Sequence, residues 1–218
     1  MKNAALLRIA VFDYGAGNLH SLVKALALPE TIVRVEPDPA LAADRSLTDL
    51  LVLPGVGAFA AAAARIGDAR ASMQRALDDG LCCLGICLGM QLLFDASEEG
   101  EGDGAGLGVV QGRVRRLRAA RVPQIGWNTV HADAQREPAF AASQLSVAYY
   151  ANSYVGEPAS DLVVSAWSEH DGDRFPAAVR AGPRGNVVGV QFHPEKSSAA
   201  GVAFVRGIAR RAREEVQG

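Results

Sequence analysis

The feature that most constrains this fold is an apolar segment that ends in a cysteine between two glycines. Residues 81–84 read Leu-Cys-Cys-Leu without a polar side chain, which is typical of a strand covered on both faces of a parallel sheet. Gly85 and Gly89 then bracket Cys87 at the spacing G-x-C-x-G. This is the thiol form of the G-x-S-x-G elbow, in which a strand turns tightly into a helix and a nucleophile projects from the strand end. We therefore expect a helix after Cys87, whose inward-facing residues would be Met90, Leu92, Leu93 and Phe94.

The same pattern leaves the role of Cys87 open. Backbone amides at the start of the following helix would favour the thiolate form of Cys87, as a nucleophile requires. A small buried cysteine at a glycine-rich turn fits the spacing equally well. The adjacent Cys82 and Cys83 are interpreted as packing residues of the strand.

Short apolar strands alternate with helical periodicity through the first half of the chain. Strands are predicted at residues 6–12, 31–35 and 50–53, and helices at 19–26, 58–65 and 72–79. This alternation predicts a right-handed parallel sheet with helices on both faces, and a ligand site at the rim where the strands end.

The second half is more strand-like. Segments rich in β-branched and aromatic residues occur at 109–117, 147–154, 162–167, 177–180 and 187–192, and residues 97–108 are expected to form a surface loop. A helix over 199–215 closes the chain. We predict an α/β fold with a mostly parallel central sheet, an antiparallel extension on the same sheet, and one domain spanning residues 1–218.

Composition narrows the function classes. The net charge of -2 gives no electrostatic signature of nucleic-acid or membrane binding, and the basic run at 113–121 is interpreted as an exposed strand and loop. Neither a signal peptide nor an apolar stretch long enough to span a bilayer is recognised. Three cysteines, two of them adjacent, suit a reducing compartment, so a cytoplasmic location is expected.

A cysteine nucleophile needs a base, and the base needs a partner that fixes its tautomer. His193 follows the apolar strand at 187–192, and Glu195 lies two residues further on, across Pro194. The contexts of the other histidines are weaker. Acyl transfer also needs oxyanion donors: the amide of Leu88 is one candidate, and the glycine-rich loop 54–57 offers a second.

Six motifs together resemble a known family. GICLGMQLLF (85–94), VQFHPEKS (190–197) and LPGVGAF (53–59) are similar to the class I, triad-type glutamine amidotransferases, which have a flavodoxin-like three-layer sandwich fold. DYGAGNLHSL (13–22), PQIGWN (123–128) and YYANSY (149–154) narrow the resemblance to the glutaminase subunits of imidazole glycerol phosphate synthase. The motifs extend over nearly the whole chain in the expected order.

The resemblance implies an enzyme of histidine biosynthesis. It would hydrolyse L-glutamine to glutamate and ammonia through a glutamyl-thioester, without a cofactor or metal. Ammonia would pass to a separate cyclase subunit, in a heterodimer, to form imidazole glycerol phosphate and aminoimidazole carboxamide ribotide.

The resemblance also assigns roles position by position. Cys87 would be the nucleophile, His193 the general acid and base, and Glu195 its orienter, with the amides of Val56 and Leu88 as oxyanion donors. The residues that would contact substrate are Gly57, Gln91, Glu99, Ser153 and Tyr154. The residues that would face the cyclase are Asn18, Ser21, Trp127, Asn128 and Lys196.

The resemblance further implies that the amide of Val56 has to rotate into place, and we hypothesise that this keeps hydrolysis slow until the cyclase and its ligand are present. One detail concerns this chain in particular. Where the family commonly has His before the Ser-Tyr pair, this chain has Asn152.

The alternative functions are a glutaminase serving another synthase, a free-standing thiol hydrolase, and a binding subunit that has lost the chemistry.

Overall fold

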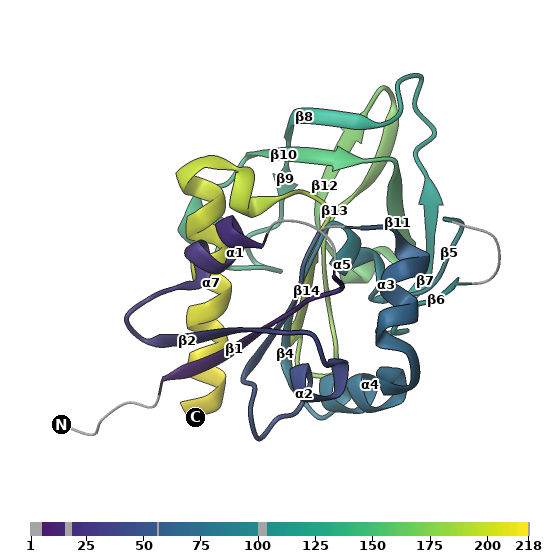
Figure 1. Cartoon of the computed structure of the whole chain (residues 1–218). Helices are drawn as coiled ribbons and strands as arrows, with labels where there is room; N and C mark the ends of the chain where they lie inside the picture. The colour runs from purple at the N-terminus through teal and green to yellow at the C-terminus, as the bar shows by residue number, and fades with distance from the viewer. Residues whose placement is uncertain (1–5, 16–18, 56, 100–103, 218) are drawn as a thin grey trace.

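A computed structural model describes residues 6–15, 19–55, 57–99 and 104–217, and its centre is an eight-stranded sheet. The strand order is β2-β1-β3-β4-β14-β13-β12-β9 (Figure 1). Neighbours from β2 to β14 are parallel, whereas β13, β12 and β9 continue the sheet in antiparallel pairing. The strands are β1 (Leu7–Phe12), β2 (Thr31–Glu36), β3 (Leu50–Leu53), β4 (Cys82–Ile86), β14 (Val187–Val190), β13 (Asp173–Ala181), β12 (Val164–His170) and β9 (His131–Ala132).

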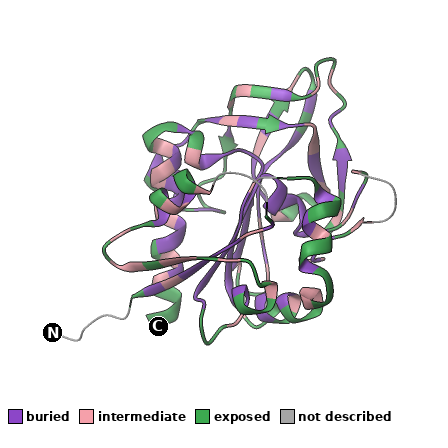
Figure 2. Ribbon diagram, in the orientation of Figure 1, coloured by how far each residue is buried: buried purple, intermediate pink, exposed green. Residues whose placement is uncertain are grey.

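Helices cover both faces of this sheet. One face packs against α1 (His20–Leu26), α6 (Ala139–Ser143) and α7 (Ser198–Gln217). The other packs against α2 (Pro39–Ala42), α3 (Phe59–Ile66), α4 (Arg70–Asp78) and α5 (Leu88–Gln91). Buried residues accordingly concentrate along the strands and on the inner sides of the helices (Figure 2). This is the predicted three-layer arrangement.

The central strands are continuously apolar because each strand contributes side chains to the hydrophobic cores on both faces of the sheet. Successive side chains point to opposite faces of a strand, so Ile9 belongs to the core beneath α7 while Ala10 belongs to the core beneath α3 and α4. Cys82 and Cys83 divide in the same way. Their interpretation as packing residues is confirmed by their burial and their free thiols.

The antiparallel half is only partly an extension of the central sheet. β12, β13 and β9 extend it, as predicted, but the other strands form two smaller sheets (Figure 1). These are β11-β7-β5-β6 and β10-β8, made of β5 (Phe94–Ser97), β6 (Gly104–Ala105), β7 (Val110–Arg116), β11 (Tyr154–Pro158), β8 (Gln124–Thr129) and β10 (Val147–Asn152). The single strand expected at 147–154 is therefore wrong: Ser153 separates β10 from β11, which pair with different partners.

The helix expected after Cys87 is shorter than predicted. α5 ends at Gln91, and Phe94 begins β5 instead of ending the helix. The backbone carbonyls of Leu92 and Leu93 accept hydrogen bonds from Leu107 and Val110, which draws this segment into the small sheet. The inward orientation is confirmed, since Met90, Leu92, Leu93 and Phe94 are all fully buried.

The surface loop expected at 97–108 is also partly wrong. Gly104–Ala105 pairs with β5, and Leu107 is buried. Residues 100–103 lie outside the described part of the chain. None of the helices among the described residues is both long enough and apolar enough to cross a membrane.

Candidate active site

Cys87 occupies a tight elbow between β4 and α5. Its backbone φ of 48° and ψ of -105° lie in a region that L-residues rarely adopt, and such strain persists where the surroundings fix it. The glycines of the motif are required by contact: a Cβ on Gly85 would lie 2.6 Å from the carbonyl oxygen of Gly89, and one on Gly89 would collide with the carbonyl of Leu53. The predicted elbow is therefore present.

Sheet register explains why distant motifs meet at Cys87. β3, β4 and β14 are adjacent and parallel, with Leu53 paired to Gly85 and Val190 paired to Ile86. The segments that follow these three strands therefore leave the same edge of the sheet together. The 54–57 loop, the Cys87 elbow and the segment carrying His193 are those segments.

His193 and Glu195 form the predicted pair. Nδ1 of His193 lies 2.9 Å from Oε1 of Glu195, and both side chains are largely buried. Glu195 lies in a single 3₁₀ turn, Pro194–Lys196, that begins with the proline. Because the carboxylate accepts from Nδ1–H, the other ring nitrogen is left for the thiol of Cys87.

The environment of His193 favours its protonated form. Burial lowers its pKa, but hydrogen bonds with Cys87 and Glu195 outweigh burial and raise the pKa to about 9. An imidazolium next to a thiol is the charge state that can deliver a proton to a leaving amine.

The predicted substrate residues converge on one cavity. Its volume is about 220 Å³. Its lining residues are Gly55, Gly57, Cys87, Leu88, Gln91, Glu99, Ala151, Asn152, Ser153 and Tyr154. All five predicted substrate contacts are in this set, together with the candidate nucleophile.

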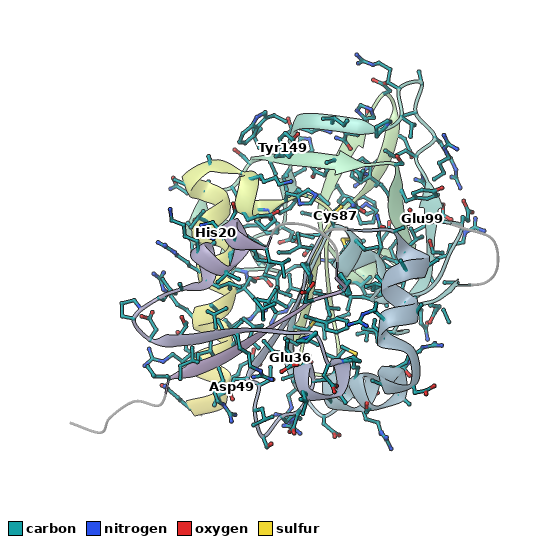
Figure 3. The ribbon with its side chains drawn as sticks, viewed as in Figure 1. His20, Glu36, Asp49, Cys87, Glu99 and Tyr149 are labelled. Atoms are coloured by element: carbon teal, nitrogen blue, oxygen red, sulfur yellow. The ribbon has the colours of Figure 1, made fainter. Side chains whose placement is uncertain are left out.

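Gln91 and Glu99 face the cavity with acceptor atoms. Nε2 of Gln91 donates to the carbonyl oxygen of Tyr154 at 2.9 Å and to Oε1 of Gln191 at 3.3 Å, which leaves its Oε1 as the atom available to a ligand. Oε2 of Glu99 accepts the backbone N–H of Phe59, the first residue of α3. Figure 3 shows Glu99 beside α3, with Cys87 near the centre of the molecule.

Of the two predicted oxyanion donors, the structure places one. Leu88 is buried directly after Cys87 and begins α5, so its amide lies at the cavity wall. Val56 lies outside the described residues. Gly55 was not singled out from the sequence, yet a Cβ there would lie 2.9 Å from Cε1 of His193 and 3.0 Å from Cβ of Cys87. This close approach needs the loop to carry a glycine.

Asn152, which departs from the family pattern, is part of the cavity wall. Its side chain is buried, and Nδ2 donates to the carbonyl oxygen of Tyr154 at 3.1 Å. Oδ1 is buried without a hydrogen-bond partner among the described residues. Asn152 and Gln91 thus hold the same carbonyl from two sides.

Two of the residues predicted to face the partner, Trp127 and Lys196, lie close to Tyr149, which was not singled out from the sequence. The rings of Trp127 and Tyr149 meet edge to face at 6.2 Å, and Nζ of Lys196 lies 6.0 Å from the Tyr149 ring. Trp127 is 57% exposed. Asn128 follows Trp127, and its Nδ2 donates to the carbonyl of Glu169.

One other partner-facing prediction lies on α1. Ser21 is exposed on α1, which contacts the turn that carries Lys196. Asn18 lies outside the described residues. We call Ser21, Trp127, Tyr149 and Lys196 the Trp127 patch.

The described residues contain no cluster of three or more His, Cys, Asp or Glu side chains arranged to hold a metal ion.

Comparisons with known proteins agree with this geometry. Residues 10–206 match the family described as "Glutamine amidotransferase class-I". The chain is 41% identical over 205 residues to "Imidazole glycerol phosphate synthase subunit HisH" of Halobacterium salinarum, covering 92% of this chain and 91% of the relative. It is 40% identical over 218 residues to the protein of that name from Zymomonas mobilis, covering 94% and 96%.

The fold is similar to that of a solved structure described as "Structure of PurLQS from Thermotoga maritima". The TM-score is 0.70 at 18% identity, covering 94% of this chain and 99% of that one. At this identity the likeness supports the fold alone. The elbow, the buried His-Glu pair and the cavity agree with the family match and with the two relatives. The chain therefore belongs to the class I glutamine amidotransferases, within the family of the HisH subunits of imidazole glycerol phosphate synthase.

Proposed function

We propose that this chain is the glutaminase subunit of imidazole glycerol phosphate synthase and that Cys87, His193 and Glu195 are its catalytic triad. The observation that carries the proposal is the cavity at the edge of the parallel sheet that Cys87 shares with Gln91, Glu99 and the 153–154 segment, with the buried His193-Glu195 pair next to Cys87. The family description supports the use of glutamine, and the relatives' names support a subunit of imidazole glycerol phosphate synthase.

The first half of the reaction forms a thioester. The Cys87 thiolate attacks the side-chain carbonyl carbon of glutamine, and the developing oxyanion accepts a hydrogen bond from the amide of Leu88 and, in this proposal, from that of Val56. The imidazolium of His193 gives its proton to the leaving nitrogen, the C–N bond breaks, and ammonia departs.

The second half restores the enzyme. Neutral His193 takes a proton from water, the resulting hydroxide attacks the thioester carbon, and the C–S bond breaks to release glutamate. The thiolate and imidazolium are regenerated. Glu195 keeps the ring in the required tautomer throughout and stabilises its cationic form, because it accepts the Nδ1 proton at 2.9 Å.

The cavity walls match the two ends of glutamine. We assign the α-ammonium group to the carboxylate of Glu99 and to Oε1 of Gln91, the acceptors that face the cavity. The α-carboxylate is assigned to the backbone around Ser153 and Tyr154. Gly57 leaves room for the substrate beside the proposed oxyanion donors.

The Trp127 patch is proposed as the face that meets the cyclase. The carbonyl oxygen of Tyr149 accepts the backbone N–H of His193 at 2.8 Å, and the N–H of Tyr149 donates to Oγ of Ser197. Tyr149 of the patch is therefore bonded directly to the segment that carries His193, and we propose that ammonia leaves on this side. Large exposed aromatics such as Trp127 are favoured anchors of interfaces. A cytoplasmic location, where the cyclase and its substrate would meet this chain, belongs to the same proposal.

The proposal is tested by measuring glutamine hydrolysis for the chain alone, with the cyclase, and with the cyclase and its nucleotide ligand. We expect low activity alone and strong activation in the complete assembly. A free-standing thiol hydrolase would be as fast alone as with the cyclase, and a glutaminase serving another synthase would not respond to this cyclase. Either result would contradict the proposal.

A further inference from the structure

Gln191 is a buried polar residue for which the proposed reaction has no role. It follows β14, is 0% exposed, and its backbone N–H donates to the carbonyl of Ala177. A buried amide side chain is costly unless its donors and acceptor are satisfied. The partners that satisfy Gln191 belong to the active site.

Its side chain joins the nucleophile to a cavity residue. Nε2 of Gln191 lies 3.5 Å from Sγ of Cys87 and donates to it, and Oε1 accepts from Nε2 of Gln91 at 3.3 Å. Cys87 and Gln191 are neighbours because each follows directly after the paired residues Ile86 and Val190 of β4 and β14.

The direction of these hydrogen bonds follows from a backbone carbonyl. The carbonyl oxygen of Tyr154 can only accept, so Gln91 must present its NH₂ group there. The same nitrogen reaches Gln191, so Gln191 must present its oxygen to Gln91 and its NH₂ group to the sulfur. The alternative orientation of the Gln191 amide would place two donors against each other and an acceptor against the thiolate.

We propose that Gln191 is a positioning residue that holds the Cys87 sulfur in its reactive form and orientation. An N–H donated to a sulfur stabilises the negative charge of a thiolate more than it stabilises a neutral thiol. A side-chain amide does not ionise near neutral pH. Gln191 can therefore donate a hydrogen bond to the sulfur without competing with His193 as a base. The consequence for turnover rests on the proposed glutaminase function, whereas the effect on the thiol does not.

A test of this proposal must separate the effect of Gln191 from that of the other titratable groups near the sulfur. The titratable side chains of the site are His193 and Glu195 from the segment after β14, Glu99 from the segment after β5, and Tyr154 at the start of β11. Replacing Gln191 leaves all four in place. A change in the reactivity of Cys87 then reports the lost amide.

The test is the pH profile of Cys87 alkylation by iodoacetamide in the full-length chain, read by peptide mass spectrometry. For Gln191→Met we expect the profile to move to higher pH and the rate at pH 7 to fall about 3- to 10-fold, the loss expected for one ordinary hydrogen bond. Cys82 is an internal reference, since its thiol donates to Glu215 at the other end of β4, and its profile should not move.

A matched control lies at the other end of β14. Asn186 is also buried and amide-bearing, but its Nδ2 donates to the carbonyls of Leu77 and Leu81. Asn186→Leu should lower the melting temperature without moving the Cys87 profile. If Gln191→Met does not fold, Gln91→Met decides the question, because it removes the donor that orients Gln191 and should shift the profile in the same direction.

An unchanged Cys87 profile in the folded variant overturns the proposal. In the assembly with the cyclase and its ligand, Gln191→Met should lower kcat about 10-fold and change KM less, because the direct contact that is lost is to the nucleophile, whereas Gln191 reaches the substrate site only through Gln91. If the wild-type chain does not hydrolyse glutamine even in that assembly but the alkylation profile still moves, the glutaminase function is wrong and the role of Gln191 stands.

Discussion

Nδ1 of His193 lies 2.9 Å from Oε1 of Glu195, although a proline separates the two residues in the chain. The 3₁₀ turn that starts at Pro194 reverses the backbone and brings the carboxylate onto the ring. A buried imidazole would ordinarily stay neutral, and the contacts with Glu195 and Cys87 reverse that preference.

This pair predicts a pH dependence of stability. The folded-state pKa of His193, about 9, lies above the ordinary value near 6.5. Its protonation therefore stabilises the fold fully below about pH 6.5, and this contribution, at most about 3 kcal/mol, is lost as pH rises toward 9. In Glu195→Gln the decline should be smaller, because the pKa of His193 falls. Urea unfolding at pH 6 and pH 9 measures both declines. Equal declines in the wild type and the variant would be incompatible with this pairing.

The close packing of Gly55 against the triad predicts a loss of activity when this glycine is replaced. In Gly55→Ala the added methyl group would press on the His193 ring and on Cβ of Cys87, at 2.9 and 3.0 Å. We expect kcat for glutamine hydrolysis to fall roughly 100-fold, as a misplacement of about 1 Å can cost. Gly207→Ala, in the middle of α7, is the control and should leave kcat unchanged. Normal hydrolysis by Gly55→Ala would contradict the described approach of the loop to the triad.

Glu99 predicts a selective effect on substrate affinity. Glu99→Gln keeps an oxygen that can accept the N–H of Phe59 but removes the charge proposed to bind the substrate ammonium group. KM for glutamine should rise about 10- to 100-fold, since a hydrogen bond to a charged group contributes about 1.5–3 kcal/mol. The neighbouring Glu98 is exposed and pairs with Arg113, so Glu98→Gln should leave KM unchanged. Equal KM values for both variants would remove Glu99 from the substrate site.

The link between the small and central sheets predicts a large stability effect. Arg115 of β7 and Asp173 of β13 form a buried two-point ion pair, with both N–O distances at 2.7 Å. Asp173→Asn should destabilise the fold by about 3 kcal/mol, because the buried guanidinium of Arg115 loses its two-point partner and keeps only Glu157, 3.0 Å from its Nε. The exposed pair of Arg121 and Asp171 gives a matched control, for which Asp171→Asn should cost no more than about 1 kcal/mol. Denaturant unfolding compares the two variants, and equal costs would contradict a structural role for the buried pair.

The parallel half of the fold could be predicted well, because its strands and helices are each indicated by residues that are close together in the sequence. Strands β1 to β4 and helices α1, α3 and α4 follow from apolar runs and helical spacing, and their bounds differ from the predictions by only a few residues. The elbow and the His-Glu pair are short motifs at strand ends. The parallel sheet then brings these motifs together without further information.

What the sequence did not reveal depends on pairing between distant segments. The turn at Leu92 and Leu93 follows from hydrogen bonds with residues 107–110, which no local spacing indicates. Gln191 was visible as a polar residue at the end of an apolar strand, but its partners became evident only when β4 and β14 were aligned. Tyr149 gains its significance from Trp127 on a paired strand.

The most direct test of the proposed division of labour is synthesis by the assembly of Cys87→Ala with the cyclase, measured once with glutamine and once with ammonia as the nitrogen source. The account predicts that glutamine-dependent synthesis is abolished while ammonia-dependent synthesis stays at the wild-type rate, and that Cys82→Ala, at a packing position of the same strand, retains both. Equal loss of both syntheses in Cys87→Ala, or retention of glutamine-dependent synthesis, would contradict it.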